Sequence, residues 1–257
     1  MSALTGQVAI VTGAGTGIGY QTAVALAQAG AALVLAGRRE APLLEARAAV
    51  EAAGGKAIVR PTDLEDGDAA AALGQWVLQE MGRVDILVNN AGHSTSVRSI
   101  RHVSPREWDS VFKVNVEGVY RLTQSVIESM IERGSGTVVT VSSMAALQPG
   151  LLGGIPYSAA KAASLNLVHG MNAELRSHGV RACAIIPAEV NTPILDNRPS
   201  PPDAAARATM MQPEDVAGAI LLCVTLPGRT TIEQIVLKPT IGRDTSAEQA
   251  VAATKSA

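Results

Sequence analysis

The chain has 257 residues, of which 47% are hydrophobic and 17% charged, and its formal net charge is -2. This apolar fraction can build a core without disulfides or metals, and the near-neutral charge gives no basis for binding nucleic acid or an acidic membrane. We expect no membrane span and no cleavable signal, because no long apolar run appears and Met1 to Gly6 leads straight into the first predicted strand. Cys183 and Cys223 lie in apolar runs, which indicates buried thiols in a reducing compartment. We therefore expect a soluble cytoplasmic protein.

Short β-branched runs alternate with longer Ala-rich amphipathic stretches along the chain. The predicted strands are Val8–Val11, Ala32–Ala36, Ala57–Arg60, Ile86–Val88, Thr137–Val141, Arg181–Ile186 and Gln234–Leu237. The predicted helices span residues 18–29, 41–53, 67–81, 105–133, 157–178 and 213–225. Glycines suited to the left-handed helix end follow five of them: Gly30, Gly54, Gly82, Gly134 and Gly179.

The strands are apolar on both faces, which is typical of a parallel sheet buried between helices. The alternation therefore predicts an α/β fold, a single-domain doubly wound Rossmann-type sheet of about seven strands with helices on both faces. We expect this domain to span residues 1–243, followed by a small polar tail, residues 244–257, that frays.

A glycine-rich turn, Thr12-Gly13-Ala14-Gly15-Thr16-Gly17-Ile18-Gly19, connects the first strand to the first helix. Glycines let the backbone approach a ligand closely, and a helix N-terminus offers amides and a positive dipole end to a pyrophosphate. The spacing is G-x-x-x-G-x-G instead of the usual G-x-G-x-x-G, and an ordinary βα turn is the alternative. Its position between strand and helix favours a dinucleotide site, with contacts from Gly13, Thr16, Gly17, Ile18 and Gly19.

Two arginines, Arg38 and Arg39, follow the second strand where an acid that binds a ribose 2′-hydroxyl is usual. Guanidinium groups suit a 2′-phosphate, which favours NADP over NAD. Glu40 could be the missing acid, but it precedes Ala41-Pro42, which is typical of a helix start that favours negative charge. A solvated cluster at the helix entry is the alternative for the arginines.

Tyr157 and Lys161 are four residues apart near the start of a predicted helix, so both face one side of it. An ammonium beside a phenol lowers the phenol pKa, which would make Tyr157 a general acid or base for carbonyl/alcohol interconversion. Ser143 closes the fifth strand and could hold the substrate oxygen.

A set of motifs occurs in order along the chain: Thr12–Gly19, Asp63-Leu64, Asn89-Asn90-Ala91-Gly92, Asn115, Ser143, Tyr157-x-x-x-Lys161 and Pro187…Thr192. The set resembles the short-chain dehydrogenase/reductase family over almost the whole chain. Arg38-Arg39 and the ending Leu226-Pro227…Glu233–Pro239 are similar to the NADP-dependent group that acts on 3-hydroxy acids and related small alcohols. The resemblance implies an oxidoreductase that transfers a hydride between NADP(H) and an alcohol or carbonyl, such as a carbonyl reductase.

The resemblance also implies residue roles. Tyr157 would be the acid/base, Lys161 would bind the nicotinamide ribose and lower the Tyr157 pKa, Ser143 would orient the substrate oxygen, and Asn115 would hold a water of a proton relay. The remaining cofactor contacts would be Asp63 and Leu64 at the adenine, Asn90, Ala91 and Gly92 along the cofactor, and Pro187, Val190 and Thr192 near the nicotinamide. A turn or cap role remains open for Asp63, and a helix-kinking role for Asn115.

Two departures from the family pattern affect this transfer of roles. Ala188 stands where the family has Gly after the sixth strand, which could constrain φ or shift the cofactor. The loop from Ser143 to Tyr157 is about one residue longer than usual, which leaves Ser142 as a lesser candidate for the serine role. His93 is interpreted as a loop or pocket-wall residue, and no metal site is expected.

A Pro-rich excursion beyond the sixth strand, at about residues 193–210, is placed to form a substrate lid; a stiffened surface loop is the alternative. The expected apolar wall consists of Met144, Leu147, Leu152, Ile155, Ile194 and Leu195. Such a pocket suits a small or medium hydrophobic ketone or secondary alcohol, and Arg198 or His93 could accept the carboxylate of a 3-hydroxy acid.

The helices over residues 105–133 and 157–178 are the expected interface of a homodimer or homotetramer. Two other functions remain open. One is a dinucleotide-binding regulator or scaffold without redox turnover, which the intact Ser, Tyr, Lys and Asn set disfavours. The other is an epimerase or dehydratase that oxidises its substrate only transiently.

Overall fold

Seven parallel strands form one sheet in the computed structural model, which describes residues 3–256. The strands are β1 (Val8–Thr12), β2 (Ala32–Gly37), β3 (Lys56–Pro61), β4 (Ile86–Asn89), β5 (Gly136–Val141), β6 (Val180–Pro187) and β7 (Gln234–Leu237). Their order across the sheet is β3-β2-β1-β4-β5-β6-β7. The predicted doubly wound parallel sheet is confirmed, and each predicted strand lies within an observed one.

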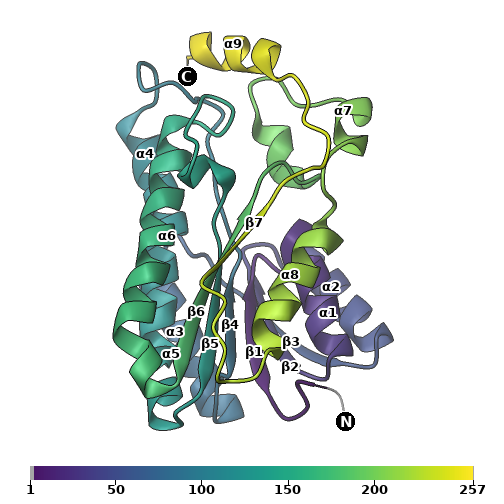
Figure 1. The fold of residues 1–257 in the computed structure, drawn as a ribbon, viewed down its shortest axis with the longest axis vertical. Coiled ribbons are helices and arrows are strands. Elements are labelled where there is room, and N and C mark those ends of the chain that lie inside the picture. Colours follow the sequence, from purple (N-terminus) through teal and green to yellow (C-terminus); the bar gives the residue numbers. More distant parts are fainter. Residues whose placement is uncertain (1–2, 257) are drawn as a thin grey trace.

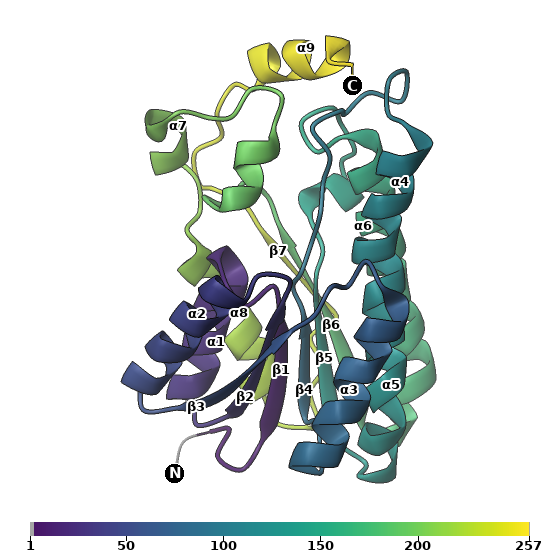
Figure 2. The same ribbon diagram turned by 180° about the vertical axis from the view of Figure 1, so that it is seen from behind.

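Helices cover both faces of the sheet (Figures 1 and 2). One layer contains α1 (Gly17–Gln28), α2 (Glu40–Ala52) and α8 (Pro213–Thr225); the other contains α3 (Gly67–Met81), α5 (Gly118–Glu132) and α6 (Ile155–Leu175). In β1, Ala9 and Val11 pack into the first layer, whereas Val8 and Ile10 pack into the second. Strands with two buried faces need apolar residues at successive positions, which explains the continuous apolar runs.

The predicted helix 105–133 is interrupted in the structure. It consists of α4 (Pro105–Phe112), a π-helical segment at Lys113–Glu117, and α5. Asn115 lies in the π-helical segment, and its Nδ2 donates a hydrogen bond to the Val111 carbonyl, 2.8 Å away. Single π-helical turns within α-helices often occur at functional sites.

Short helical elements that the periodicity does not predict lie beyond the carboxyl ends of the strands. Among them are η2 (Met144–Ala146), η4 (Pro193–Asn197), α7 (Ala204–Ala208) and α9 (Ser246–Thr254). Figure 1 shows α7 and α9 at the end of the molecule opposite the N-terminus. The expectation that the segment after Arg243 frays is wrong, because Ser246–Thr254 is helical, Ala252 is buried, and Glu248 pairs with two arginines.

Other local predictions are confirmed. All five glycines predicted at helix ends have positive φ: Gly30, Gly54, Gly82, Gly134 and Gly179. Cys183 on β6 and Cys223 on α8 are buried free thiols. Within residues 3–256, no helix combines the length and apolarity needed to cross a membrane.

Candidate active site

The site lies at the carboxyl edge of the sheet between β1 and β4, where the strand order reverses direction. Thr12 ends β1, and its Oγ1 accepts hydrogen bonds from the backbone nitrogens of Asn90 and Ala91, both 3.0 Å away. Asn90 Nδ2 donates in return to the Thr12 carbonyl at 2.9 Å. These bonds fix two loops side by side at the crevice where doubly wound sheets bind ligands.

The glycine-rich turn is shaped by close backbone contacts. Gly13 and Gly17 have φ of +63° and +55°, a region that favours glycine. A Cβ at Gly19 would lie 2.2 Å from the Gly13 carbonyl oxygen, so any side chain there would displace the turn. No side chain caps the start of α1, and its first turn has no acidic residue. The amides at this end are therefore available to an anion.

Two cavities meet along this turn. The larger has a volume of about 540 Å³ and the smaller about 200 Å³. Both are lined by Gly13, Thr16, Ala91 and Gly92. The larger cavity is also lined by Gly17, Ile18, Asn90, Ser143, Met144, Tyr157, Lys161, Pro187, Val190, Thr192, Ile194 and Leu195. The smaller is also lined by Arg38, Arg39, Asp63 and Leu64. Of the predicted site residues, Gly19 and Asn115 line neither cavity.

The smaller cavity is cationic on one side. Arg38 and Arg39 line it, and no carboxylate in residues 3–256 forms an ion pair with either. Asp63 Oδ1 accepts a hydrogen bond from the Glu65 backbone nitrogen at 3.0 Å, so Asp63 is a turn residue as well as part of the lining. His93 also lines this cavity, as expected for a wall residue; burial lowers its pKa, and Arg38 lowers it further.

Ser143, Tyr157 and Lys161 converge on the larger cavity. Lys161 Nζ lies 5.6 Å from the Tyr157 ring centroid and donates a 2.8 Å hydrogen bond to the Val141 carbonyl. Ser143 hydrogen-bonds to the Tyr157 side chain. The Ser142 hydroxyl has a different partner, because it donates a hydrogen bond to the Lys161 carbonyl at 3.0 Å. The two adjacent serines therefore have different surroundings, and Ser143 is the one beside the phenol.

The electrostatics at Tyr157 differ from the sequence-based expectation. Burial raises the Tyr157 pKa, and this effect outweighs the lowering by the Ser143 hydrogen bond and by the charges of Arg98 and Arg198. Burial also lowers the Lys161 pKa to about 8. The expected net lowering of the Tyr157 pKa by Lys161 is therefore wrong in this structure, because desolvation disfavours the charged forms of both groups.

Asn115 fastens the loop that follows β4. Its Nδ2 donates to the His93 carbonyl at 2.8 Å in addition to Val111, and its Oδ1 accepts from the His93 backbone nitrogen at 3.4 Å. A methyl on Gly92 would lie 3.3 Å from Asn115 Oδ1 and 3.4 Å from Lys161 Nζ. Asn115 Oδ1 and Lys161 Nζ therefore both lie close to Gly92.

The substrate end of the larger cavity is mostly aliphatic. Met144, Leu152, Ile194 and Leu195 line it as expected, whereas Leu147 and Ile155 do not. Leu147 is 46% exposed, because the turn at η2 directs it outward. Ala188 also lines this cavity and has no positive φ; its nitrogen donates to the Leu237 carbonyl at 2.8 Å. The methyl in place of the usual glycine hydrogen therefore causes no backbone strain.

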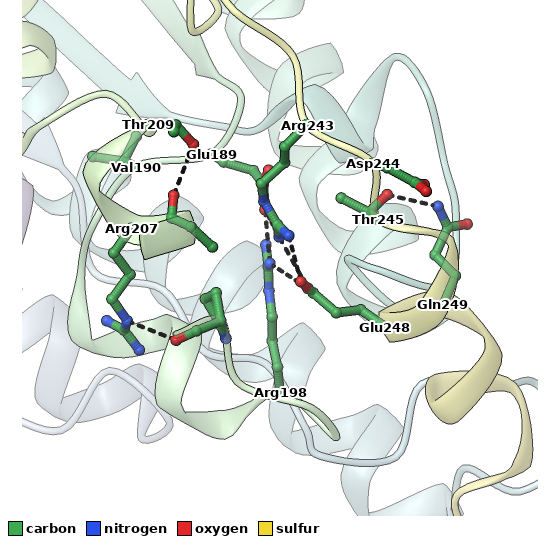
Figure 3. A network of polar contacts seen from close by, with 12 residues as sticks. Glu189, Val190, Arg198, Arg207, Thr209, Arg243, Asp244, Thr245, Glu248 and Gln249 are labelled. Carbon is green, nitrogen blue, oxygen red and sulfur yellow. Dashed lines mark hydrogen bonds and ion pairs between the residues drawn. The ribbon is translucent and has the colours of Figure 1, made fainter. Parts of the chain in front are cut away.

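Neither predicted carboxylate acceptor is available. His93 lines the other cavity, and Arg198 already pairs with Glu189 at 2.7 Å and Glu248 at 3.2 Å. Arg243 completes the network by pairing with both glutamates (Figure 3). The four side chains are only 11–18% exposed, and they join the loop after β6, the segment that follows Pro193–Asn197, and α9.

Among the residues of the larger cavity that sequence reasoning missed are three with polar side chains: Arg98, Glu189 and Gln249. Arg98 is 3% exposed although it belongs to a polar loop. No local pattern marks these positions, because each is brought to the cavity by a loop or by the C-terminal segment. Among residues 3–256, no group of His, Cys, Asp or Glu side chains is arranged to hold a metal ion.

The fold and site define a Rossmann-type α/β protein with a Ser, Tyr and Lys set beside a dinucleotide-type turn. Residues 7–203 match the model of the short chain dehydrogenase family. An uncharacterized oxidoreductase of Staphylococcus aureus is 33% identical, with 93% of this chain and 100% of that protein covered. A 3-oxoacyl-[acyl-carrier-protein] reductase of Synechocystis is 34% identical, covering 90% of this chain and 94% of the relative.

A comparison with solved structures supports the same family. A metagenomic short-chain oxidoreductase in complex with NADP is 32% identical and superimposes with a TM-score of 0.81, covering 94% of this chain and 100% of the other. The chain therefore belongs to the short-chain dehydrogenase family of NAD(P)-dependent oxidoreductases.

Proposed function

We propose that this protein transfers a hydride between NADP(H) and a carbonyl or secondary alcohol, with Tyr157 as the general acid/base. The observation that carries the proposal is the convergence of Ser143, Tyr157 and Lys161 on one cavity that is continuous with the glycine-rich turn.

The residues present fit a dinucleotide. The turn at Gly13–Gly19 packs so closely on its neighbours that a side chain at Gly13 or Gly19 would collide with them, and the uncapped start of α1 offers amides to a pyrophosphate. Arg38 and Arg39 offer guanidinium donors to a 2′-phosphate in the smaller cavity. Lys161, which lines the larger cavity, would hold the nicotinamide ribose. The metagenomic relative whose structure contains NADP supports the same assignment.

When bound, the nicotinamide supplies or accepts the hydride. Ser143 holds the substrate oxygen beside Tyr157, whose hydroxyl gives a proton to a carbonyl oxygen or takes one from an alcohol. Lys161 and Asn115 would form a route along which the Tyr157 hydroxyl exchanges its proton with solvent, through the π-helical segment that contains Asn115. The aliphatic side chains of the cavity exclude water from the reacting carbon.

Replacing Tyr157 with Phe tests the acid/base role. A positioned general acid or base contributes about 10²–10⁴-fold to the rate. Tyr157→Phe should therefore lose kcat by that factor while its affinity for NADPH, measured by fluorescence titration, stays within a few-fold of wild type. Near-wild-type kcat would refute the assignment.

Replacing Arg38 with Ser tests the cofactor preference. A hydrogen bond to a charged group contributes about 1.5–3 kcal/mol, which predicts a preference for NADP(H) over NAD(H) of one to two decades in kcat/KM. Arg38→Ser should reduce that preference, whereas Arg101→Ser, an exposed position that lines neither cavity, should not. Equal kcat/KM for both cofactors in the wild type would contradict the proposal.

The aliphatic lining supports a small or medium hydrophobic ketone or secondary alcohol as substrate, whereas a 3-hydroxy acid would need a carboxylate acceptor other than His93 and Arg198. The Synechocystis relative, named as a 3-oxoacyl reductase, supports a 3-oxo or 3-hydroxy group. A panel of ketones, 3-oxo esters and polyols assayed with NADPH discriminates these classes. Best turnover of polyols would contradict the proposal.

We expect a homodimer or homotetramer with α4, α5 and α6 at the interface. Tyr120 on α5 is 45% exposed, which is consistent with an apolar contact there. Sedimentation equilibrium measures the mass directly, and an active monomer would exclude this assembly.

A further inference from the structure

Three cationic side chains line the larger cavity within the described residues: Arg98, Lys161 and Arg198. Their charges are balanced differently. Arg198 forms ion pairs with Glu189 and Glu248, as described above. Lys161 and Arg98 have no carboxylate partner within residues 3–256, so their charge is not cancelled by the protein around the cavity.

Arg98 is held rigidly at the start of α6, the helix that carries Tyr157. Its Nη1 donates to the Gly153 carbonyl and to Ser94, and its own carbonyl accepts from the Ile155 nitrogen at 2.9 Å. The side chain passes so close to Gly154 that a Cβ there would lie 2.6 Å from Arg98 Cδ. Nε is buried without a partner. A guanidinium fixed in this way cannot rotate away from the cavity to find an anion in solvent.

A buried, uncompensated cation is unfavourable unless negative charge develops beside it. The phenol that the proposed mechanism ionises lies in the same cavity, and the interaction is mutual: the Arg98 charge lowers the Tyr157 pKa, and Tyr157 raises that of Arg98. Burial and the repulsion from Arg198 hold the Arg98 pKa at about 10, which still leaves it charged at pH 8–9, where Lys161 loses its proton.

We propose that Arg98 is a positioning residue for the acid/base step, whose fixed positive charge stabilises the phenolate form of Tyr157. The inference rests on the proposed function, because it assumes that Tyr157 is the group that exchanges the proton. The groups around the phenol are Lys161 on its own helix, Ser143 at the end of β5, Arg98 on the loop after β4, and Arg198 on the lid with Glu189 and Glu248. Of the two arginines, Arg98 alone is uncompensated.

The test is the pH dependence of kcat/KM in both directions, with NADP(H) and a neutral ketone and its alcohol. Oxidation needs the phenolate and rises through the Tyr157 pKa, whereas reduction needs the phenol and falls through it. The positive charge of Arg98 favours the phenolate and so lowers the Tyr157 pKa. In Arg98→Met both midpoints should therefore move to higher pH.

Matched variants separate charge from packing. Arg98→Gln is a second neutral variant that keeps an amide donor for the Gly153 carbonyl, and it should show the same upward shift. Arg98→Lys keeps the charge and should retain the wild-type midpoint. Arg101→Met removes one exposed positive charge three residues further along the same loop and should leave the midpoint unchanged.

Two results would overturn the inference. If both neutral variants lower kcat uniformly and leave the midpoint in place, Arg98 is only a clamp between loops. If they raise KM for carboxylate substrates alone, with an unmoved midpoint, Arg98 binds a substrate anion instead.

A measurement without turnover separates this inference from the proposed function. The chain has only three tyrosines, so the ultraviolet phenolate titration of the protein minus that of Tyr157→Phe isolates the ionisation of Tyr157. The Tyr157 midpoint obtained from this difference should be higher when Arg98→Met is present than when Arg98 is in place, even if no tested substrate reacts. An unchanged midpoint in this titration would overturn the role of Arg98 and leave the oxidoreductase assignment standing.

Discussion

Replacing Glu248 with Gln removes one of the two carboxylates that neutralise Arg198 and Arg243. Glu248 is 14% exposed, and its partners are 11% and 16% exposed, so solvent screens the resulting imbalance only in part. Loss of a hydrogen-bonded charged partner costs about 1.5–3 kcal/mol. Only Ala252 of α9 is fully buried, so apolar packing holds this helix weakly. We therefore expect α9 to undock locally while the sheet remains folded.

A loss of 1.5–3 kcal/mol corresponds to a roughly 10- to 140-fold increase in the undocked population. Amide hydrogen exchange within Ser246–Thr254 should accelerate by that factor, with little change in α8. Glu233→Gln is the matched control, because it breaks a pair with Arg176 whose side chains are 50% and 55% exposed, and such pairs contribute about 0–1 kcal/mol. Equal exchange rates in α9 for the two variants would refute the view that the network docks the helix.

Three further results are expected. Gly19→Ala places a methyl 2.2 Å from the Gly13 carbonyl and should weaken NADPH binding at least tenfold by calorimetry; unchanged affinity would show that the turn relaxes freely. Leu195→Ala removes a 5% exposed side chain from the expected lid at about residues 193–210, so KM for a hydrophobic ketone should rise several-fold, and an unchanged KM and kcat would exclude a lid role. Burial raises the Glu189 pKa, but hydrogen bonds from Arg243 and Arg198 outweigh it and leave the pKa lowered. The stability that Glu189 contributes is therefore full above its ordinary pKa of 4.5 and is lost as pH falls through the lower folded-state value, which urea unfolding across this range measures.

Local sequence features determined much of the architecture. Apolar runs and helical periodicity are properties of residues that are neighbours in the chain, so they predicted all seven strands of the described sheet and the main helices. The glycine-rich turn and the Tyr157/Lys161 spacing are equally local, and they identified both ends of the site. The π-helical turn at Asn115 was missed because a single inserted residue barely disturbs an amphipathic pattern.

Charge pairing could be decided only by the tertiary structure. Glu189 and Arg243 are 54 residues apart, and Arg198 and Glu248 are 50 apart, so no local pattern connects them. In the sequence Arg198 looked available for a carboxylate and the C-terminal segment looked unstructured; pairing between them corrected both expectations. The surroundings of Tyr157 followed the same rule. The Tyr157 pKa depends on desolvation by the surrounding loops and on the charge of Arg98, which belongs to a loop distant in the sequence. Tyr157 is buried only because the sheet brings those loops together.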